Sequence, residues 1–197
     1  MFPAIFPKGE IKRGLLGCLE IALLMRQGRN RFGNSQQEAI RSFIVPILLS
    51  PLVLLAIMLY PAPEISQVSR DTLSLMYALR MAAVTALFLG AVWWIVREID
   101  RREYFLQFVI AMNWLSVPAT VLILPCLYLI FSGHYTWAEL YPFTCVLMGY
   151  SYLFTAFMAS CVLRIPLELA GFITFISYAV NTHTMEIMNW IGQNFLS

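Results

Sequence analysis

The chain is poor in charge. Aspartate, glutamate, lysine and arginine make up 12% of its 197 residues, whereas hydrophobic residues make up 60%. A soluble domain has about 25% charged and about 45–50% apolar residues, so this chain has too few polar side chains to cover a surface that faces water. The net charge of +2 gives no basic excess for a nucleic-acid partner. These deficits predict an all-α membrane protein with one membrane domain.

Motifs of catalysis are also missing. The sequence contains no GxSxG, HExxH, P-loop or GxGxxG pattern. Four cysteines occur, none in a CxxC pair, and free cysteines in apolar runs are typical packing residues: Cys18, Cys126, Cys145 and Cys161. We therefore expect a protein that is not an enzyme and binds no cofactor. Residues 1–14 lack the pattern of a signal peptide, so we expect the N-terminus to be retained.

The sequence instead contains long runs of uncharged, mostly apolar residues. The segment 43–60, FIVPILLSPLVLLAIMLY, has no charge and reaches the length of about 18 residues that crosses a bilayer core of about 30 Å. Pro46 and Pro51 are expected to kink this span, and 61–63, Pro-Ala-Pro, to end it. Similar runs follow. Within a membrane domain over 36–197 we expect five helical spans, at about 42–60, 72–96, 104–131, 141–163 and 167–190.

The basic residues predict the orientation of these spans. Eleven of the 13 lysines and arginines lie before the first span, in the turn 97–103 or at Arg164. Short loops rich in lysine and arginine stay in the cytoplasm. Arg70 and Arg80 are the exceptions, and 132–140 has no basic residue. We therefore expect a cytoplasmic N-terminus and a C-terminus on the outside.

The segment 1–35 is expected to form a cytoplasmic lead. Residues Glu10 to Gln27 predict an amphipathic helix that stops at Gly28 and has Leu15, Leu19 and Leu23 on its apolar face. Such a helix lies in the headgroup region, or packs on the ends of the membrane helices; both need the same face. The following turn carries three arginines that fit either anionic lipid or a plain topology signal: Arg26, Arg29 and Arg31. Ser35 and Glu38 have capping-box spacing, which starts the next helix near Gln36.

Six polar residues within or next to the spans are candidate interaction residues: Arg80, Asn113, Glu168, Asn181, His183 and Glu186. Arg80 predicts an ion or lipid-headgroup site. The alternative is a helix that starts late, near Met76, so that Arg80 snorkels outward to the interface. Asn113 predicts a hydrogen bond between helices, with a substrate contact as the alternative. Glu168 is spaced to form an ion pair with Arg164.

Near the end of the chain, Asn181, His183 and Glu186 make the most specific group of polar residues. His183 and Glu186 share a helix face and predict a hydrogen-bonded helix end at the outer interface. A metal site completed by His134 is the alternative, since a catalytic zinc normally has three protein ligands.

Two stretches carry a resemblance to a known family: RSFIVPILLSPL, from Arg41 to Leu52, and WWIVREIDRREYFLQFVIAMNW, from Trp93 to Trp114. With five closely spaced spans after a cytoplasmic lead, the chain resembles the short bacterial Yip1-domain membrane proteins over about 40–190. The likeness implies a bacterial inner-membrane protein with no enzymatic activity, no cofactor and no assigned functional residues. The eukaryotic family's acidic-Leu-Tyr-Gly-Pro motif is absent, and its Gly-Tyr-x-x-x-Pro motif is matched only at Gly149-Tyr150.

Two functions follow as hypotheses. The first is a non-enzymatic accessory or membrane-organising protein that associates with lipid, with other integral membrane proteins or with itself. The second is a small transporter or channel whose path is lined by Arg80, Asn113 and Asn181 beside proline-kinked helices. The two differ in whether these polar residues face one another across one cavity.

Overall fold

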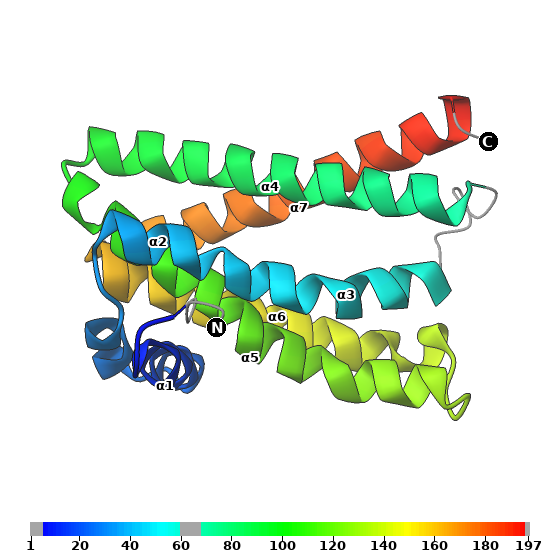
Figure 1. Ribbon diagram of the computed structural model, residues 1–197, viewed down its shortest axis with the longest axis horizontal. Helices are drawn as coiled ribbons and strands as arrows, with labels where there is room; N and C mark the ends of the chain where they lie inside the picture. Colours follow the sequence, from blue (N-terminus) through cyan, green and yellow to red (C-terminus); the bar gives the residue numbers. More distant parts are fainter. Residues whose placement is uncertain (1–5, 60–67, 196–197) are drawn as a thin grey trace, which may run out of the picture.

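The computed structural model describes residues 6–59 and 68–195, and every regular element in these residues is a helix. The helices are α1 (Glu10–Ala22), η1 (Arg26–Arg31), α2 (Gln36–Ser42), α3 (Ile44–Leu59), α4 (Arg70–Glu98), η3 (Arg102–Tyr104), α5 (Phe105–Phe131), α6 (Trp137–Leu163) and α7 (Leu167–Phe195). Figure 1 shows α3 to α7 extending along the long axis of the molecule, while α1 lies across one end and is seen end-on. The turns between α4 and α5 and between α6 and α7 lie at that same end.

The helix predicted to start near Gln36 and to continue through the first span is divided into two helices, α2 and α3. Ser35 Oγ accepts a hydrogen bond from the Glu38 N–H at 3.2 Å, and α2 begins at Gln36 as predicted. Pro46 lacks the N–H that would bond the Ser42 carbonyl oxygen, and the helix is interrupted at Phe43, between α2 and α3. The predicted end of this span, at residue 60 with a proline stop at 61–63, lies outside the described residues.

The four long helices follow the predicted ranges, with two differences at their ends. α6 begins at Trp137 rather than near 141, because Thr136 and Glu139 form a reciprocal capping box that the prediction left in the loop. α7 continues to Phe195 rather than ending at 190. In its last turn the Asn194 side-chain amide donates to the Trp190 carbonyl oxygen at 2.8 Å.

The predicted helix Glu10–Gln27 is wrong beyond Ala22. Leu24 adopts a left-handed φ of 58°, and two hydrogen bonds close the helix end: Met25 N–H to Glu20 O at 2.7 Å and Leu24 N–H to Ile21 O at 2.8 Å. This is the Schellman arrangement, which usually has glycine at the left-handed position. A leucine there gave no stop signal in the sequence.

Three helices are long and apolar enough to cross a membrane: α4, α5 together with the turn η3 before it, and α6. Of the first predicted span, the described helix α3 has 16 residues, 44–59. The fifth, α7, does not meet the same criterion, and its sequence contains Glu168, Asn181, His183 and Glu186. The structure therefore supports a helical membrane protein with three candidate spans.

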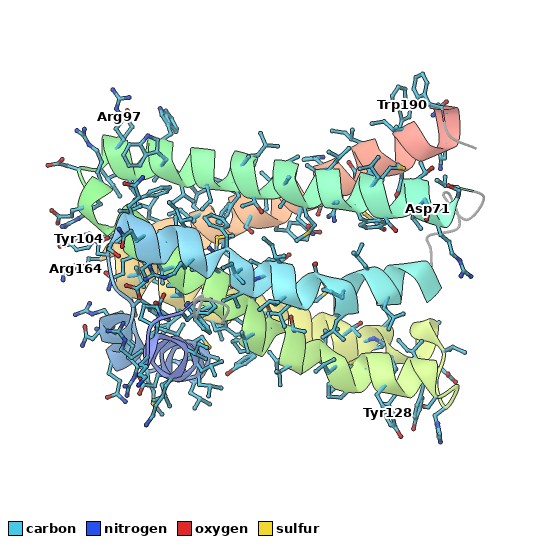
Figure 2. The ribbon with its side chains drawn as sticks, in the orientation of Figure 1. Asp71, Arg97, Tyr104, Tyr128, Arg164 and Trp190 are labelled. Atoms are coloured by element: carbon cyan, nitrogen blue, oxygen red, sulfur yellow. The ribbon has the colours of Figure 1, made fainter. Side chains whose placement is uncertain are left out.

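The main hydrophobic core lies toward the end of the bundle that α1 covers. Phe88, Phe108, Phe154 and Met158 are at most 2% exposed and join α4, α5 and α6. A smaller cluster at the other end joins α4 to α7 and contains Val68, Leu73, Tyr77 and Met188. Figure 2 shows Arg97, Tyr104 and Arg164 at the end with α1, and Asp71, Tyr128 and Trp190 at the opposite end.

Candidate functional site

The α1 helix has two different faces. The buried face lies against the bundle and consists of Glu10, Gly14, Gly17, Cys18, Ile21 and Ala22. The exposed apolar residues, here called the α1 ridge, are Ile11, Leu15, Leu19, Leu23, Leu24 and Met25. Leu15, Leu19 and Leu23, the predicted interaction face, are 36%, 51% and 63% exposed. None of the residues that the structure describes covers that face.

Glycines allow α1 to lie close to α5 and to the η1 segment. A Cβ atom at Gly14 would be 2.3 Å from Trp114 Cε2, and one at Gly17 would be 2.8 Å from Phe32 Cζ. Both distances are below what real Cβ atoms tolerate. Gly28, which the sequence placed at a helix stop, lies instead in η1 with its Cα facing α1, where a Cβ would be 2.7 Å from the Gly17 carbonyl oxygen. The three glycines therefore serve close packing on and around α1.

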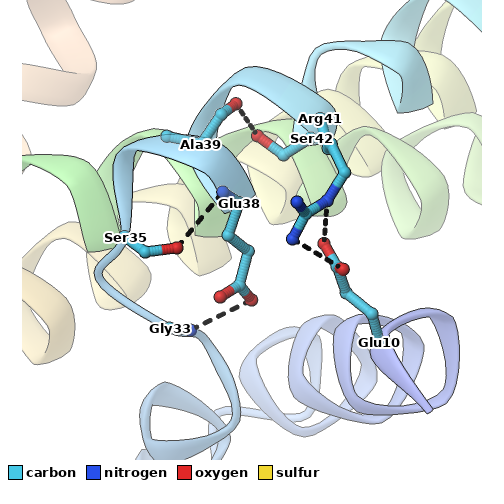
Figure 3. A network of polar contacts seen from close by, with 7 residues as sticks. All are labelled: Glu10, Gly33, Ser35, Glu38, Ala39, Arg41 and Ser42. Carbon is cyan, nitrogen blue, oxygen red and sulfur yellow. Dashed lines mark hydrogen bonds and ion pairs between the residues drawn. The ribbon is translucent and has the colours of Figure 1, made fainter. Parts of the chain in front are cut away.

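A buried ion pair fastens the start of α1 to α2. Arg41 Nη2 lies 3.0 Å from Glu10 Oε2, and the Glu10 side chain is 2% exposed. Figure 3 shows Arg41 reaching from α2 to Glu10 on α1, with the Ser35–Glu38 cap in the same helix. Glu38 also accepts a hydrogen bond from the Gly33 N–H at 3.3 Å, which ties the approach to α2 to its first turn.

Asn113 contributes to the same end of the molecule. Its Nδ2 donates to Ser42 Oγ at 2.8 Å, and both side chains are buried. Ser42 Oγ in turn donates to the Ala39 carbonyl oxygen at 2.7 Å. The predicted hydrogen bond of Asn113 between helices therefore joins α5 to α2, and its amide is occupied there.

The three arginines of η1 have different roles. Arg31 forms a two-bond ion pair with Glu20, with Nε 2.7 Å from Oε2, and this guanidinium lowers the pKa of Glu20. Arg29 Nη1 donates to the Cys161 carbonyl oxygen of α6 at 3.3 Å. Gln107 Nε2 donates to the carbonyl oxygens of Arg29 and Phe32 at 2.9 and 3.0 Å. Arg29 and Arg31 thus hold η1 against its neighbours, whereas Arg26 is exposed.

Basic side chains flank the α1 ridge. The following are exposed and form no ion pair within the described residues: Lys8, Lys12, Arg13 and Arg26.

Cys18, on the buried face, donates its thiol to the Leu15 carbonyl oxygen at 3.2 Å, and burial raises its pKa to about 11. This cysteine is therefore a protonated packing residue rather than a nucleophile.

Arg80 and Asn181 meet between α4 and α7. Arg80 Nη2 lies 2.6 Å from Asn181 Oδ1 and 3.0 Å from the Asn181 carbonyl oxygen. Arg80 is ten residues after Arg70, the first residue of α4, which is about 15 Å along the axis at 1.5 Å per residue. A helix starting late, near Met76, was the basis for predicting that Arg80 snorkels outward; α4 instead starts at Arg70, so that basis is removed.

The predicted ion pair between Arg164 and Glu168 is not among the ion pairs of the described residues. Arg164 ends α6 in a left-handed conformation with φ 54°, and its guanidinium carbon lies 4.4 Å from the ring centroid of Tyr104. Glu168 is exposed in the first turn of α7. The left-handed turn and Pro166 interrupt the helical geometry on which the spacing argument depended.

His183 and Glu186 do share a face of α7. His183 Nδ1 lies 3.1 Å from Glu186 Oε2, and the two side chains are 73% and 67% exposed. His134 contacts Ser132 Oγ at 2.7 Å in the turn between α5 and α6. Among the residues that the structure describes, no three His, Cys, Asp or Glu side chains gather as a metal site. The alternative that joined His134 to His183 and Glu186 is therefore not assembled.

Several contacts that hold the N-terminal elements were not predicted: the Glu10–Arg41 pair, the Gly14–Trp114 contact and the hydrogen bond from the Tyr150 hydroxyl to the Ala22 carbonyl oxygen. A lone glutamate at the start of a helix gave only a capping signal, and residues far apart in the sequence carry no spacing rule. GLLGC in α1, with small residues three and four apart, was the one usable sign of close helix packing.

Searches against family models, curated proteins and solved structures return no significant match.

Proposed function

We propose that this chain is a non-enzymatic, five-span membrane protein that acts by association, and that its α1 ridge lies in the headgroup region of the cytoplasmic leaflet. The observation that carries the proposal is the exposure of the ridge on a helix that lies across the bundle. An exposed row of leucines costs free energy in water, at about 25 cal/mol per Å² of apolar surface. The boundary between headgroups and acyl chains removes that cost.

Charge placement supports the same location. Lys12, Arg13 and Arg26 flank the ridge and are exposed, and a basic residue near an anionic leaflet contributes about 1 kcal/mol. Arg97 and Arg164 lie at the same end of the bundle. This end is the cytoplasmic one in the proposed orientation, with the N-terminus inside and the C-terminus outside.

In this proposal α3 and α7 complete the five spans. α3 lies against α5, with Val45 in the shared core, and α7 lies against α6 and α4. Both helices follow the long axis beside the three candidate spans (Figure 1). Exposed apolar residues on α7, such as Phe172 and Phe175, fit a face toward lipid. The 29 residues of α7 give about 43 Å of helix, longer than a bilayer core of about 30 Å.

Transport through the protein is less well supported than association. Asn113 gives its amide to Ser42 inside the core, whereas Arg80 and Asn181 contact each other between α4 and α7. The three residues predicted to line one path thus belong to two separate contacts. Association therefore remains the proposal. The proposed location is a bacterial inner membrane, and the proposed class is a Yip1-like organising protein. Its proposed partners are membrane lipid, other membrane proteins or a second copy of the chain.

The position of the ridge is tested with a fluorescent label. Leu19→Cys carries a bimane label in a chain whose exposed native thiol is removed by Cys145→Ala, and Glu98→Cys, at an exposed acidic position outside α1, is the matched control. In vesicles, lipids brominated near the headgroup should quench the label at 19 more strongly than aqueous iodide does, and the label at 98 should show the reverse. Equal iodide quenching at both positions would contradict the interfacial location.

Association is tested by gentle extraction of the tagged chain and native mass spectrometry. The expected result is a stoichiometric partner or a second copy of the chain. This assembly should be lost when Leu15, Leu19 and Leu23 are all replaced by serine. Replacing Lys8, Lys12 and Arg13 together by glutamine should weaken lipid association and leave the assembly intact. Intact assemblies after the serine changes would remove the ridge as the interaction surface. A lone monomer in the unchanged chain would shift the weight to transport.

A further inference from the structure

A groove runs along α7 beside α4. It has a volume of about 460 Å³, and its lining is apolar apart from two side chains, His183 and Thr184. It extends from Phe172 to Ile187 on α7, with Leu87 as the residue from α4. Fifteen residues of helix span about 22 Å at 1.5 Å per residue. The hydrocarbon half of one leaflet is about 15 Å deep, so the groove is long enough for one acyl chain.

Arg80 lies beside this groove, joined to its lining through Asn181. Arg80 Nη2 donates to the Asn181 carbonyl oxygen at 3.0 Å. Thr184, which lines the groove, has its hydroxyl 2.7 Å from the Val180 carbonyl oxygen and 3.0 Å from that same Asn181 oxygen. The guanidinium therefore lies next to the polar part of the groove lining. Below that level, toward Phe172, the lining residues are apolar.

Arg80 carries a charge that the described residues leave uncompensated. Its acceptors are the side chain and backbone of a neutral asparagine, and none of the ion pairs involves it. Its Nε is buried and has no hydrogen-bond partner. Glu186 lies one turn beyond His183 but bonds His183. A cation at membrane depth pairs with an opposite charge or with backbone carbonyls. The Asn181 oxygens bond the Arg80 guanidinium but do not neutralise its charge, and an oxyanion suits a guanidinium.

We propose that the α4–α7 groove binds one phospholipid of the outer leaflet, with its anionic headgroup at Arg80 and Thr184 and an acyl chain along α7 toward Phe172. The combination of an uncompensated guanidinium with an apolar groove of acyl-chain length selects an anionic amphiphile over a soluble ion. This inference rests on the proposal that α7 crosses the membrane, and its site is separate from the α1 ridge.

The test uses the full chain in nanodiscs of phosphatidylethanolamine and phosphatidylglycerol, with retained lipid counted by native mass spectrometry. We expect the unchanged chain to keep one phosphatidylglycerol and Arg80→Gln to lose at least tenfold of that bound population. Arg70→Gln, an exposed arginine at the start of the same helix, is the matched control and should keep the lipid. Ala179→Trp fills the groove without changing charge and should also lose it.

Arg80→Lys separates loss of charge from a folding defect. It keeps the charge and should therefore retain more phosphatidylglycerol than Arg80→Gln. The helix content of all variants is compared by circular dichroism. Equal retention by the unchanged chain and a folded Arg80→Gln overturns the proposal, as does an equal loss in Arg70→Gln. Phosphatidylglycerol retained by Ala179→Trp would show that the groove is not the binding site, which also overturns the proposal. None of these variants touches the α1 ridge, so these results and those of the bimane experiment are independent.

Discussion

Replacing Glu10 by glutamine tests how α1 is held to the bundle. The change keeps the shape of the side chain and removes its charge, which leaves Arg41 facing a neutral amide. Breaking a buried ion pair by removing one partner costs about 3–5 kcal/mol. Glu10 is 2% exposed, but Arg41 keeps 28% exposure, so water recovers part of the loss. We therefore expect a cost of about 1.4–2.8 kcal/mol for holding α1 in place.

Hydrogen exchange followed by mass spectrometry measures that cost in α1. A loss of about 1.4–2.8 kcal/mol corresponds to a tenfold to hundredfold faster exchange of α1 amides. Glu98→Gln, an exposed glutamate at the end of α4, is the matched control and should change nothing in α1. Adding Arg41→Met to Glu10→Gln should slow the exchange again, because no buried charge is then left unpaired. Exchange within threefold of the unchanged chain would refute the ion pair as the fastening of α1.

Three further changes have defined outcomes. Leu24→Gly should stabilise the end of α1 by about 0.5–1 kcal/mol, because glycine adopts the left-handed conformation without strain, and it should slow amide exchange at the helix end. Arg31 lowers the pKa of Glu20 below its ordinary 4.5, so this pair stabilises the α1–η1 contact above that value and its contribution is lost as the pH falls through the lowered pKa. Exchange in η1 should then quicken in acid, and Glu20→Gln should remove that dependence. His183→Ala and Glu186→Ala should leave partner recovery in native mass spectrometry unchanged, because both side chains are exposed and contact each other.

The helices could be predicted where a local signal sets them. Ser35 and Glu38 cap α2 with the spacing that the sequence displays, and uncharged runs fix most of α4, α5, α6 and α7. The prediction failed at the end of α1, because a leucine takes the left-handed position that glycine usually occupies. It also failed at the start of α6, where Thr136 and Glu139 carried a capping signal that was assigned to a loop.

The candidate sites were harder to predict, because they depend on which faces meet. Arg80, Asn113 and Asn181 were found from polarity at membrane depth, but the sequence could not say that Asn113 bonds Ser42 while Arg80 bonds Asn181. Arg29 and Arg31 counted as free charges until their contacts with Cys161 and Glu20 were known. Pairing across more than one helix has no spacing rule, and it decides which charges remain for a partner.

The contacts of α1 and η1 with α6 can form only after α6 has been synthesised. Arg29 bonds the Cys161 carbonyl oxygen, 132 positions further on in the chain, and Tyr150 bonds the Ala22 carbonyl oxygen across 128 positions. α1 leaves the ribosome before α6, which carries part of its binding surface. Until α6 is made, α1 can pack on α5 at Trp114 but lacks the contacts that α6 supplies. Completion of α6 is therefore the step that completes the binding site of α1 and η1, and a chain that stalls before it leaves α1 without those contacts.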